Sequence, residues 1–302
     1  MIKTTSKHSA EVKLESCKKT RQFAADTLQS ALGELLHSHQ PISEVLVRDR
    51  WLEKLRKNPY IFPDGWYMPP PHGIGVLIGT ATKYGRHNYD TLRLQQSWPA
   101  SNIFLNKDNP LMYVYASPVD RETGMIGDFG MTLYFGDNPD VVNHLKLCLQ
   151  LDRELYNHIK IGMPFKEIYN YAQRLWHDYG FVNEIVSTSD PTGTNLGHTI
   201  PASYEDWTPH ELNLLQQGNA NYESLKNMIS KKRKFINSIE TLPVQAGMAF
   251  TNEARPTVKD HPDIPMVSFH TIIMVKPDGS MEFITQFEDI FKLVGMNYML
   301  KN

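Results

Sequence analysis

The order of helices and strands along this chain is the feature that most limits its fold. Apolar residues recur at helical spacing from about Ala10 to Leu55, and Gln40-Pro41 interrupts them. This helical N-terminal segment should therefore form two helices, the second capped by Ser43. A strand pair, two helices and a β-rich region are expected next, at Leu111–Ala116, Asp128–Phe135, Pro139–Leu155, Pro164–Tyr179 and Asn183–His198.

The C-terminal section returns to strands after a polar insertion at about 203–239, which is rich in Asn, Lys and Ser. Strand-like segments are expected at Met248–Asn252, Val267–Val275 and Met281–Thr285, with a turn between the last two at Lys276-Pro-Asp-Gly279. Helices followed by strands thus occur twice. This repetition predicts one α/β (α+β) domain over residues 1–302, built as an α/β/α duplication.

Composition narrows the class of partner. The 41% apolar and 21% charged fractions are those of an ordinary globular protein. A net charge of −2 provides no field to attract nucleic acid or an anionic membrane, so a small molecule or short peptide is the expected partner. Cys17 and Cys148 are too few and too far apart for a disulfide framework. With no signal peptide and no apolar run of ~18 residues, a cytoplasmic protein is expected.

Several local strings resemble one family, the pita-bread metallopeptidases, which include methionine aminopeptidase, aminopeptidase P, prolidase and creatinase. Gly197-His198 stands where that family has a ligand histidine, and the resemblance extends from about Phe23 to Thr285. It implies a pseudo-two-fold duplicated α/β/α sandwich with a curved, mostly antiparallel sheet. The strings are Asp128-Phe-Gly-Met-Thr-Leu-Tyr-Phe-Gly136, Gly162-Met-Pro-Phe-Lys-Glu-Ile168, Gly247-Met-Ala-Phe-Thr-Asn-Glu253 and the hairpin His270 to Gly279 followed by Phe283-Ile-Thr285.

The family's metal ligands are only partly retained. The resemblance implies two metals sharing Asp, Asp, His, Glu and Glu, but Ser117 replaces the first Asp and His270 replaces the last Glu. An imidazole nitrogen cannot bridge two metals as a carboxylate can, so both changes weaken the same metal. The remaining set is Asp128, His198, Glu253 and His270. It implies one divalent ion, and Fe, Mn, Zn and Co all suit these donors.

Other readings of these residues are open from the sequence. A lone histidine on a strand is more often hydrogen-bonded in the core or exposed than it is a ligand, which applies to both His198 and His270. Asp128 could be a turn carboxylate, and Glu253 an exposed charge at a strand end. Two simultaneous ligand changes are also the pattern of a site that has lost its metal.

The expected catalytic groups are incomplete. The family's second histidine is missing from Thr199 to Glu205, and His210 is a candidate replacement through a longer loop. Glu253 is the candidate proton carrier. Trp98-Pro99 stands near the family's other catalytic histidine, and Trp98 and Tyr67 are candidate substrate-binding residues in loops.

Two classes of function follow. The first is a metal-dependent enzyme resembling the Xaa-Pro and methionine aminopeptidases, acting on a small amino-acid-like or dipeptide substrate. If its single metal is iron, the alternative is a lyase or oxygenase-type enzyme. The second is a catalytically degenerate binding module of the same fold. A homodimer is left open by the sequence.

Overall fold

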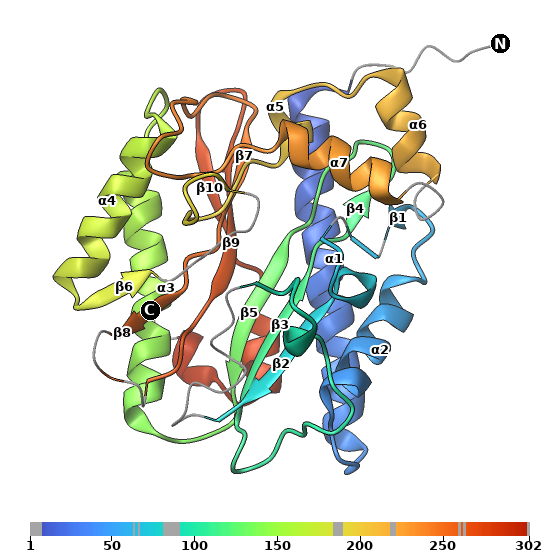
Figure 1. The fold of residues 1–302 in the computed structure, drawn as a ribbon, viewed down its shortest axis with the longest axis vertical. Coiled ribbons are helices and arrows are strands. Elements are labelled where there is room, and N and C mark those ends of the chain that lie inside the picture. The colour runs from blue at the N-terminus through green and yellow to red at the C-terminus, as the bar shows by residue number, and fades with distance from the viewer. Residues whose placement is uncertain are drawn as a thin grey trace.

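The fold combines helices and strands around one central six-stranded sheet (Figure 1). The computed structural model describes residues 8–300 apart from 63, 66, 81–90, 184–189, 218–221, 259–260 and 262–263. The sheet order is β10-β9-β5-β3-β2, with β7 also paired to β9, and each pairing is antiparallel. These strands are β2 Gly75–Gly79, β3 Leu111–Ala116, β5 Phe129–Tyr134, β7 Ala249–Asn252, β9 Phe269–Val275 and β10 Met281–Ile284.

Strand β9 connects two parts of this sheet. Its C-terminal half lies between β10 and β7, whereas its N-terminal residues Phe269 and His270 pair with Met131 and Gly130 of β5. A strand from the C-terminal section therefore lies beside the first hairpin. Two small pairs are separate from this sheet: β1 Ile61–Phe62 with β4 Val119–Asp120, and β6 Phe181–Asn183 with β8 Pro256–Val258.

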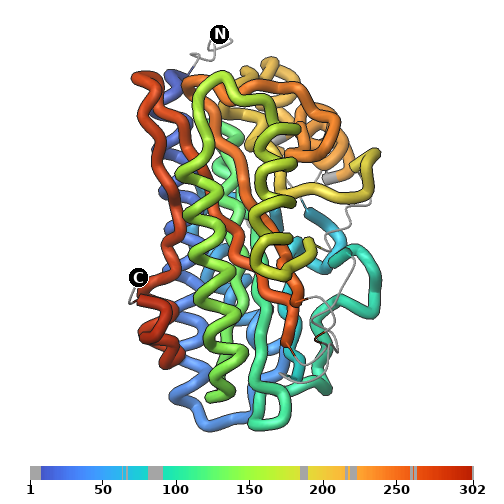
Figure 2. The backbone as a smooth tube through the Cα atoms, turned by 90° about the vertical axis from the view of Figure 1, so that its left-hand side faces the viewer, coloured from blue at the N-terminus to red at the C-terminus, as the bar shows by residue number. Residues whose placement is uncertain are grey.

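Long helices flank the sheet. In Figure 1, α1 and α2 lie to its right and α3 and α4 to its left, and Figure 2 shows these helices running roughly parallel to the long axis. Their bounds are α1 Ala10–His37, α2 Glu44–Leu55, α3 Pro139–His158, α4 Phe165–Asp178, α5 Pro201–Tyr204, α6 Pro209–Gln217, α7 Tyr222–Lys232 and α8 Glu288–Leu293, with 3₁₀ turns at Pro71–Gly73, Gln95–Ser97 and Asn297–Leu300. None of the helices in these described ranges is long and apolar enough to cross a bilayer.

Local signals explain most of these elements. Ser43 caps α2 by accepting from the Leu46 N–H, as its position predicts. The strands β3, β5 and β9 are buried along their whole length, which matches their continuous apolar sequences. The prediction of a mixed α/β protein with a mostly antiparallel sheet is therefore confirmed, together with its two N-terminal helices.

One predicted region differs. Asn183–His198 was expected to be β-rich, but within its described part only Asn183 belongs to a strand, and His198 forms an isolated bridge with Phe235. Asp190 Oδ1 accepts from the Thr192 N–H and from the side-chain amide of Asn237, which is distant in sequence, and these hydrogen bonds hold the chain in a turn. The polar insertion at about 203–239 contains α6 and α7.

Candidate metal centre

The register of three strands brings the first site residues together. Tyr115 of β3 is paired with Gly130 of β5, and Gly130 is paired with His270 of β9. Residues two apart share a face of a strand. Asp128 therefore projects from the same face of the sheet as Tyr115 and His270, the cross-strand partners of Gly130. Glycine is needed here, because a Cβ at Gly130 would lie 2.9 Å from His270 Cγ. The imidazole therefore lies directly over β5, next to Asp128.

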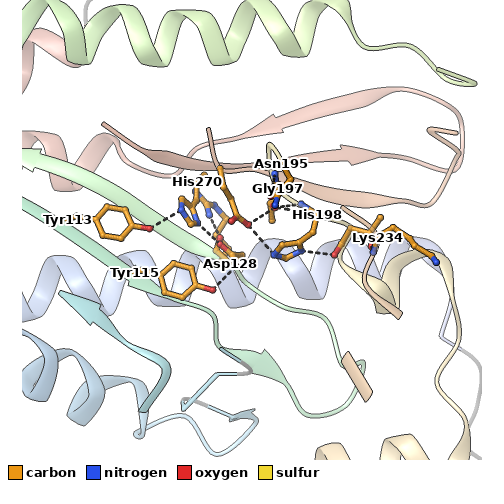
Figure 3. Close-up of polar contacts among 12 residues, drawn as sticks. Tyr113, Tyr115, Asp128, Asn195, Gly197, His198, Lys234 and His270 are labelled. Carbon is orange, nitrogen blue, oxygen red and sulfur yellow. Dashed lines mark hydrogen bonds and ion pairs between the residues drawn. The ribbon is translucent and has the colours of Figure 1, made fainter. Parts of the chain in front are cut away.

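Asp128, His198 and Glu253 form a cluster that could hold a metal ion, because one donor atom from each lies within 4.8 Å of the others. His198 Nε2 is 3.1 Å from Glu253 Oε1. Asp128 and His198 are 0% and 4% exposed, and the Glu253 side chain is 15% exposed. Figure 3 shows His198 and His270 on either side of Asp128. Sequence positions far apart thus supply one buried set of donors.

The loop at His198 is built to present that imidazole. Gly197 has φ +139°, and a Cβ there would meet the Thr251 carbonyl oxygen at 2.5 Å, so only glycine allows the loop this close to β7. The His198 N–H donates to Thr251 Oγ1 at 3.0 Å, and the Thr251 N–H donates to His198 O at 2.8 Å. Strand β7 therefore fixes both His198 and, two residues beyond Thr251, Glu253.

The protonation pattern of His198 fits a cation between it and Glu253. Nδ1 lies 2.9 Å from the carbonyl oxygen of Thr199, and a carbonyl requires a donor, so Nδ1 carries a proton. In the neutral ring Nε2 is then unprotonated, and its lone pair faces a carboxylate oxygen of Glu253. Two acceptors 3.1 Å apart need a proton or a metal between them. His198 and Glu253, together with Asp128, would hold a divalent metal at this position.

His270 lies beside this cluster and is engaged by protein at both ring nitrogens. Nδ1 is 2.9 Å from Asp128 Oδ1, and Nε2 is 2.9 Å from the Tyr113 hydroxyl. The carboxylate accepts, so Nδ1 carries a proton; in the neutral ring Tyr113 then donates to Nε2. For His270 to bind a metal through Nδ1, that proton must leave. Tyr113 can then accept from Nε2, because a hydroxyl serves in either role.

Tyrosines border the site on β3. The Tyr115 hydroxyl donates to Asp128 Oδ2 at 3.1 Å, so both oxygens of that carboxylate have partners. Tyr67 packs edge-on against the Tyr115 ring at 5.6 Å between ring centroids, and the Arg93 guanidinium lies 4.7 Å from the Tyr67 ring centroid. The candidate substrate-binding residue Tyr67 is therefore next to a residue that touches Asp128.

Two titratable groups here are strongly perturbed. Burial alone would raise the pKa of Glu253. The charges that the His198 and His270 rings carry when protonated, with the hydrogen bonds from His198 and Thr251, outweigh burial, so in the metal-free site the pKa of Glu253 lies far below the usual range. Burial, with the charges of Asp128 and Glu253, raises the pKa of Tyr115 well above its usual value. Glu253 is therefore an anion and Tyr115 a neutral hydroxyl across the physiological range.

The other predicted residues lie in different settings. His210 is exposed on α6, outside the buried cluster, and Trp98 is partly buried after the turn Gln95–Ser97. Ser117 is 0% exposed. Trp207, a loop aromatic, is buried and donates its indole N–H to the carbonyl oxygen of Thr123 at 3.1 Å, a packing role.

Tyr113 and Tyr115 are site residues that no motif of the sequence points to. The apolar run Leu111–Ala116 predicts a buried strand but does not indicate that its tyrosines carry hydroxyls into a site. A signal was present, since alternate residues of the strand put Tyr113 and Tyr115 on the same face as Ser117, the position of the missing ligand.

Comparisons with known proteins agree with this geometry. The model of metallopeptidase family M24 matches residues 96–289. No curated protein sequence matches the chain at a significant level. Similar solved structures include prolidase from Pyrococcus horikoshii OT3 (14% identity, TM-score 0.57, covering 91% of this chain and 62% of that one) and methionine aminopeptidase from Rickettsia prowazekii (14%, 0.58, 93% and 100%).

A third similar structure is the N-terminal domain of the FACT complex subunit SPT16 from Eremothecium gossypii (12% identity, TM-score 0.57, covering 94% of this chain and 59% of that one). The chain thus spans less than two thirds of the length of that structure and of the prolidase. At these identities the structures show the fold, which is the pita-bread fold. Because the family model covers well over half of the sequence, the chain belongs to metallopeptidase family M24.

Proposed function

We propose that this protein is a metal-dependent hydrolase with one divalent metal ion, acting on a small amino-acid-like or dipeptide substrate. Asp128, His198 and Glu253 are the proposed central ligands, and His270 is the fourth. The observation that carries this proposal is the contact of His198 Nε2 with Glu253 Oε1 at 3.1 Å, within a buried cluster that also contains Asp128. Donors of these types suit Fe, Mn, Zn or Co in the divalent state.

When bound, such a metal would lower the pKa of water toward ~7 and polarise a carbonyl. The protein groups have more limited roles. Glu253 can accept a proton, although as a metal ligand it would be a weaker base than a free carboxylate. Tyr115 orients the Asp128 carboxylate through Oδ2. Tyr67 and Trp98 are proposed to contact the substrate, since Tyr67 packs on Tyr115.

A single metal is favoured by the residues that replace the second metal's ligands. Ser117 is fully buried and offers a hydroxyl where the family has a carboxylate. His270 already contacts Tyr113 through one nitrogen and Asp128 through the other, so neither nitrogen is available to bridge two ions. The second metal would therefore lack both a terminal and a bridging carboxylate.

The first test is metal content. Protein purified without chelator should contain about one equivalent of divalent metal by elemental analysis, and His198→Ala should contain almost none. His210→Ala is the matched control, because His210 is exposed on α6, and it should retain the metal. Two equivalents in the unmodified chain, or equal metal in the two alanine variants, would overturn the proposal.

The second test is turnover. A panel of dipeptides and N-acyl amino acids should reveal hydrolysis that requires added metal and is lost in His198→Ala but kept in His210→Ala. Hydrolysis that persists in chelator would contradict a metal-dependent mechanism.

A binding module without catalysis is the second candidate. Its support is the similarity to the N-terminal domain of SPT16, a subunit of the FACT complex, together with the departures from the family's metal ligands at Ser117 and His270. Metal content separates the two, since a chain that neither carries nor binds stoichiometric metal would favour the binding module. An iron lyase or oxygenase-type enzyme is the remaining variant, and iron as the bound metal would favour it.

A further inference from the structure

A buried arginine from the N-terminal helix reaches the backbone of the candidate site. Arg21 of α1 is 0% exposed. Its guanidinium donates to the carbonyl oxygen of Asp128, to that of His270 at 2.6 Å and to that of Thr285 at 2.7 Å. Two of these carbonyls belong to proposed metal ligands. The residue lies outside residues 96–289, the part matched by the family model.

The Arg21 guanidinium packs closely against two aromatic rings. The guanidinium carbon lies 4.9 Å from the centroid of the Phe129 ring and 5.3 Å from that of Phe287. Burying an arginine side chain costs several kcal/mol before its contacts are counted. The contacts that offset this cost are directed at carbonyls on different strands, which the planar, forked guanidinium can bridge at once.

The helix approaches the turn before Asp128 as closely as a backbone allows. A Cβ at Gly127 would lie 2.4 Å from the Arg21 nitrogen and 2.5 Å from the Thr20 carbonyl carbon. Glycine at this position therefore lets α1 lie directly against the residue before Asp128. Both the packing and the hydrogen bonds of α1 act on the start of β5.

We propose, resting on the function proposed above, that Arg21 is a positioning residue for the metal centre. By joining the carbonyls of Asp128 and His270, it sets the separation of β5 and β9 at which the His270 ring meets the Asp128 carboxylate. The spacing of these two strands decides whether Nδ1 of His270 and Oδ1 of Asp128 are 2.9 Å apart. Folding of α1 onto the sheet is thereby coupled to the geometry of the site.

Arg21→Met tests the proposal, because methionine keeps much of the apolar stem and removes every donor. Groups that orient metal ligands typically change metal affinity about 10- to 100-fold, so the dissociation constant for Co(II) should rise by that factor. The visible absorption spectrum of the Co(II) form should also change, because it reports coordination geometry. Arg21→Lys retains the charge and three donors and should lie between Arg21→Met and the unmodified protein in both measurements.

Leu28→Ala is the matched control for destabilisation alone. Leu28 lies two turns further along α1 and is 0% exposed, so its truncation should lower the unfolding free energy. Its Co(II) affinity and spectrum should nevertheless be unchanged below the unfolding transition. If Arg21→Met behaves like Leu28→Ala, Arg21 only stabilises the fold and the proposal is wrong. If Arg21→Met does not fold, an unchanged affinity and spectrum for Arg21→Lys lead to the same conclusion.

A metal-free measurement separates this inference from the proposed function. In protein labelled with ¹⁵N-histidine, His270 should carry its proton on Nδ1, hydrogen-bonded to Asp128. That signature should be lost in Arg21→Met, weakened in Arg21→Lys and kept in Leu28→Ala. A chain that binds no metal yet shows this loss would refute the proposed function but support the positioning role of Arg21. An unaltered His270 signature in the Arg21 variants would overturn the positioning role whatever the metal content.

Discussion

At the scale of single residues, the side chains at 117 and 270 decide how many metals this site can hold. Ser117 is fully buried directly after β3, where the alternation of side chains puts it on the same side as Tyr113 and Tyr115. His270 replaces a bridging carboxylate by a ring whose two nitrogens already contact Tyr113 and Asp128. Each change removes a different ligand of the second metal: Ser117 replaces a terminal carboxylate and His270 replaces a bridging one. Restoring only one of them should therefore not restore the ion.

Ser117→Asp should leave the metal content at about one equivalent per chain. The new carboxylate would be buried without a metal to balance it, so the metal-free variant should also lose about 3 kcal/mol or more of unfolding free energy. Ser117→Asp combined with His270→Glu is the comparison, because it supplies both missing carboxylates and should bind a second ion. Stoichiometric binding of two ions by Ser117→Asp alone would show that His270 does not prevent bridging.

The sequence predicted some site residues and not others for definite reasons. Asp128, His198, Glu253 and His270 lie in strings whose order resembles a known family, so their positions could be named. Arg21 lies in a different kind of pattern. It occupies a place in the apolar stripe of α1, between Cys17 and Ala24, with buried residues every three or four positions. A charge within such a stripe indicates a buried partner, but the strand carbonyls that it meets are far away in sequence.

At the scale of elements, the approach of β5 and β9 depends on Gly130. Gly130→Ala would place a Cβ 2.9 Å from Cγ and 3.0 Å from Cδ2 of His270, so the imidazole must move away from Asp128. Overpacking of this kind typically costs about 1–3 kcal/mol, and chemical denaturation should detect that loss. The metal affinity should fall as well.

Gly33→Ala provides the control for this substitution. Gly33 is inside α1, and a Cβ there would lie 3.8 Å from Leu293 Cδ1, an ordinary contact. Because alanine is the better helix former, this variant should gain about 0.5–1 kcal/mol and keep its metal affinity. A Gly130→Ala protein as stable and as tight for metal as the unmodified chain would mean that His270 can shift without consequence.

Helix α3 should make the stability of the fold depend on pH. Burial lowers the pKa of His144 to about 4, a shift that the carbonyls of Pro256 and Pro265 only partly oppose. Between about pH 6.5 and pH 4 the unfolded chain therefore binds a proton that the native protein does not, so stability falls as the pH falls through this window. A shift of this size corresponds to about 3 kcal/mol.

The variant that isolates this effect is His144→Gln, which keeps a polar group but does not titrate. Its unfolding free energy should fall less steeply between pH 7 and pH 4 than that of the unmodified protein, by up to about 3 kcal/mol. Asp152 on the same helix has a pKa raised by burial, which acts in the opposite direction, but it is present in both proteins and cancels in the difference. Parallel pH profiles would show that His144 titrates normally.

At the scale of the whole molecule, the periodicity of apolar residues predicts the individual helices and strands better than it predicts how they pack together. The bounds of β3 and the two N-terminal helices follow from local patterns and capping. Local patterns do not contain the pairing of β9 with β5, which joins His270 to Gly130 across 140 residues of sequence. The β-rich region predicted over Asn183–His198 contains instead, in its described part, a turn at Asp190 that is held by Asn237, a contact distant in sequence. Long-range contacts of this type need the folded chain.

The whole site is expected to be poor at the reactions for which many members of the fold are known. General acid and base assistance is typically worth 10²–10⁴-fold. Here Glu253 would be a weak base because it is itself a metal ligand, and Tyr115 has a raised pKa and already donates to Asp128. Pro99 and Glu205 offer no imidazole. Proton transfer to an amide leaving group therefore lacks an efficient partner.

Cleavage of Xaa-Pro and Met-Xaa peptides should consequently be at least about 100-fold slower than the ~10 s⁻¹ of a median enzyme, in the Fe(II), Mn(II), Co(II) and Zn(II) forms alike. Release of the free amino acid, followed with each metal-loaded protein, measures this rate directly. His198→Ala gives the background, and His210→Ala controls for the loss of an exposed imidazole. Turnover near ~10 s⁻¹ that His198→Ala abolishes would show that a site with serine at 117 and histidine at 270 still carries out the full reaction.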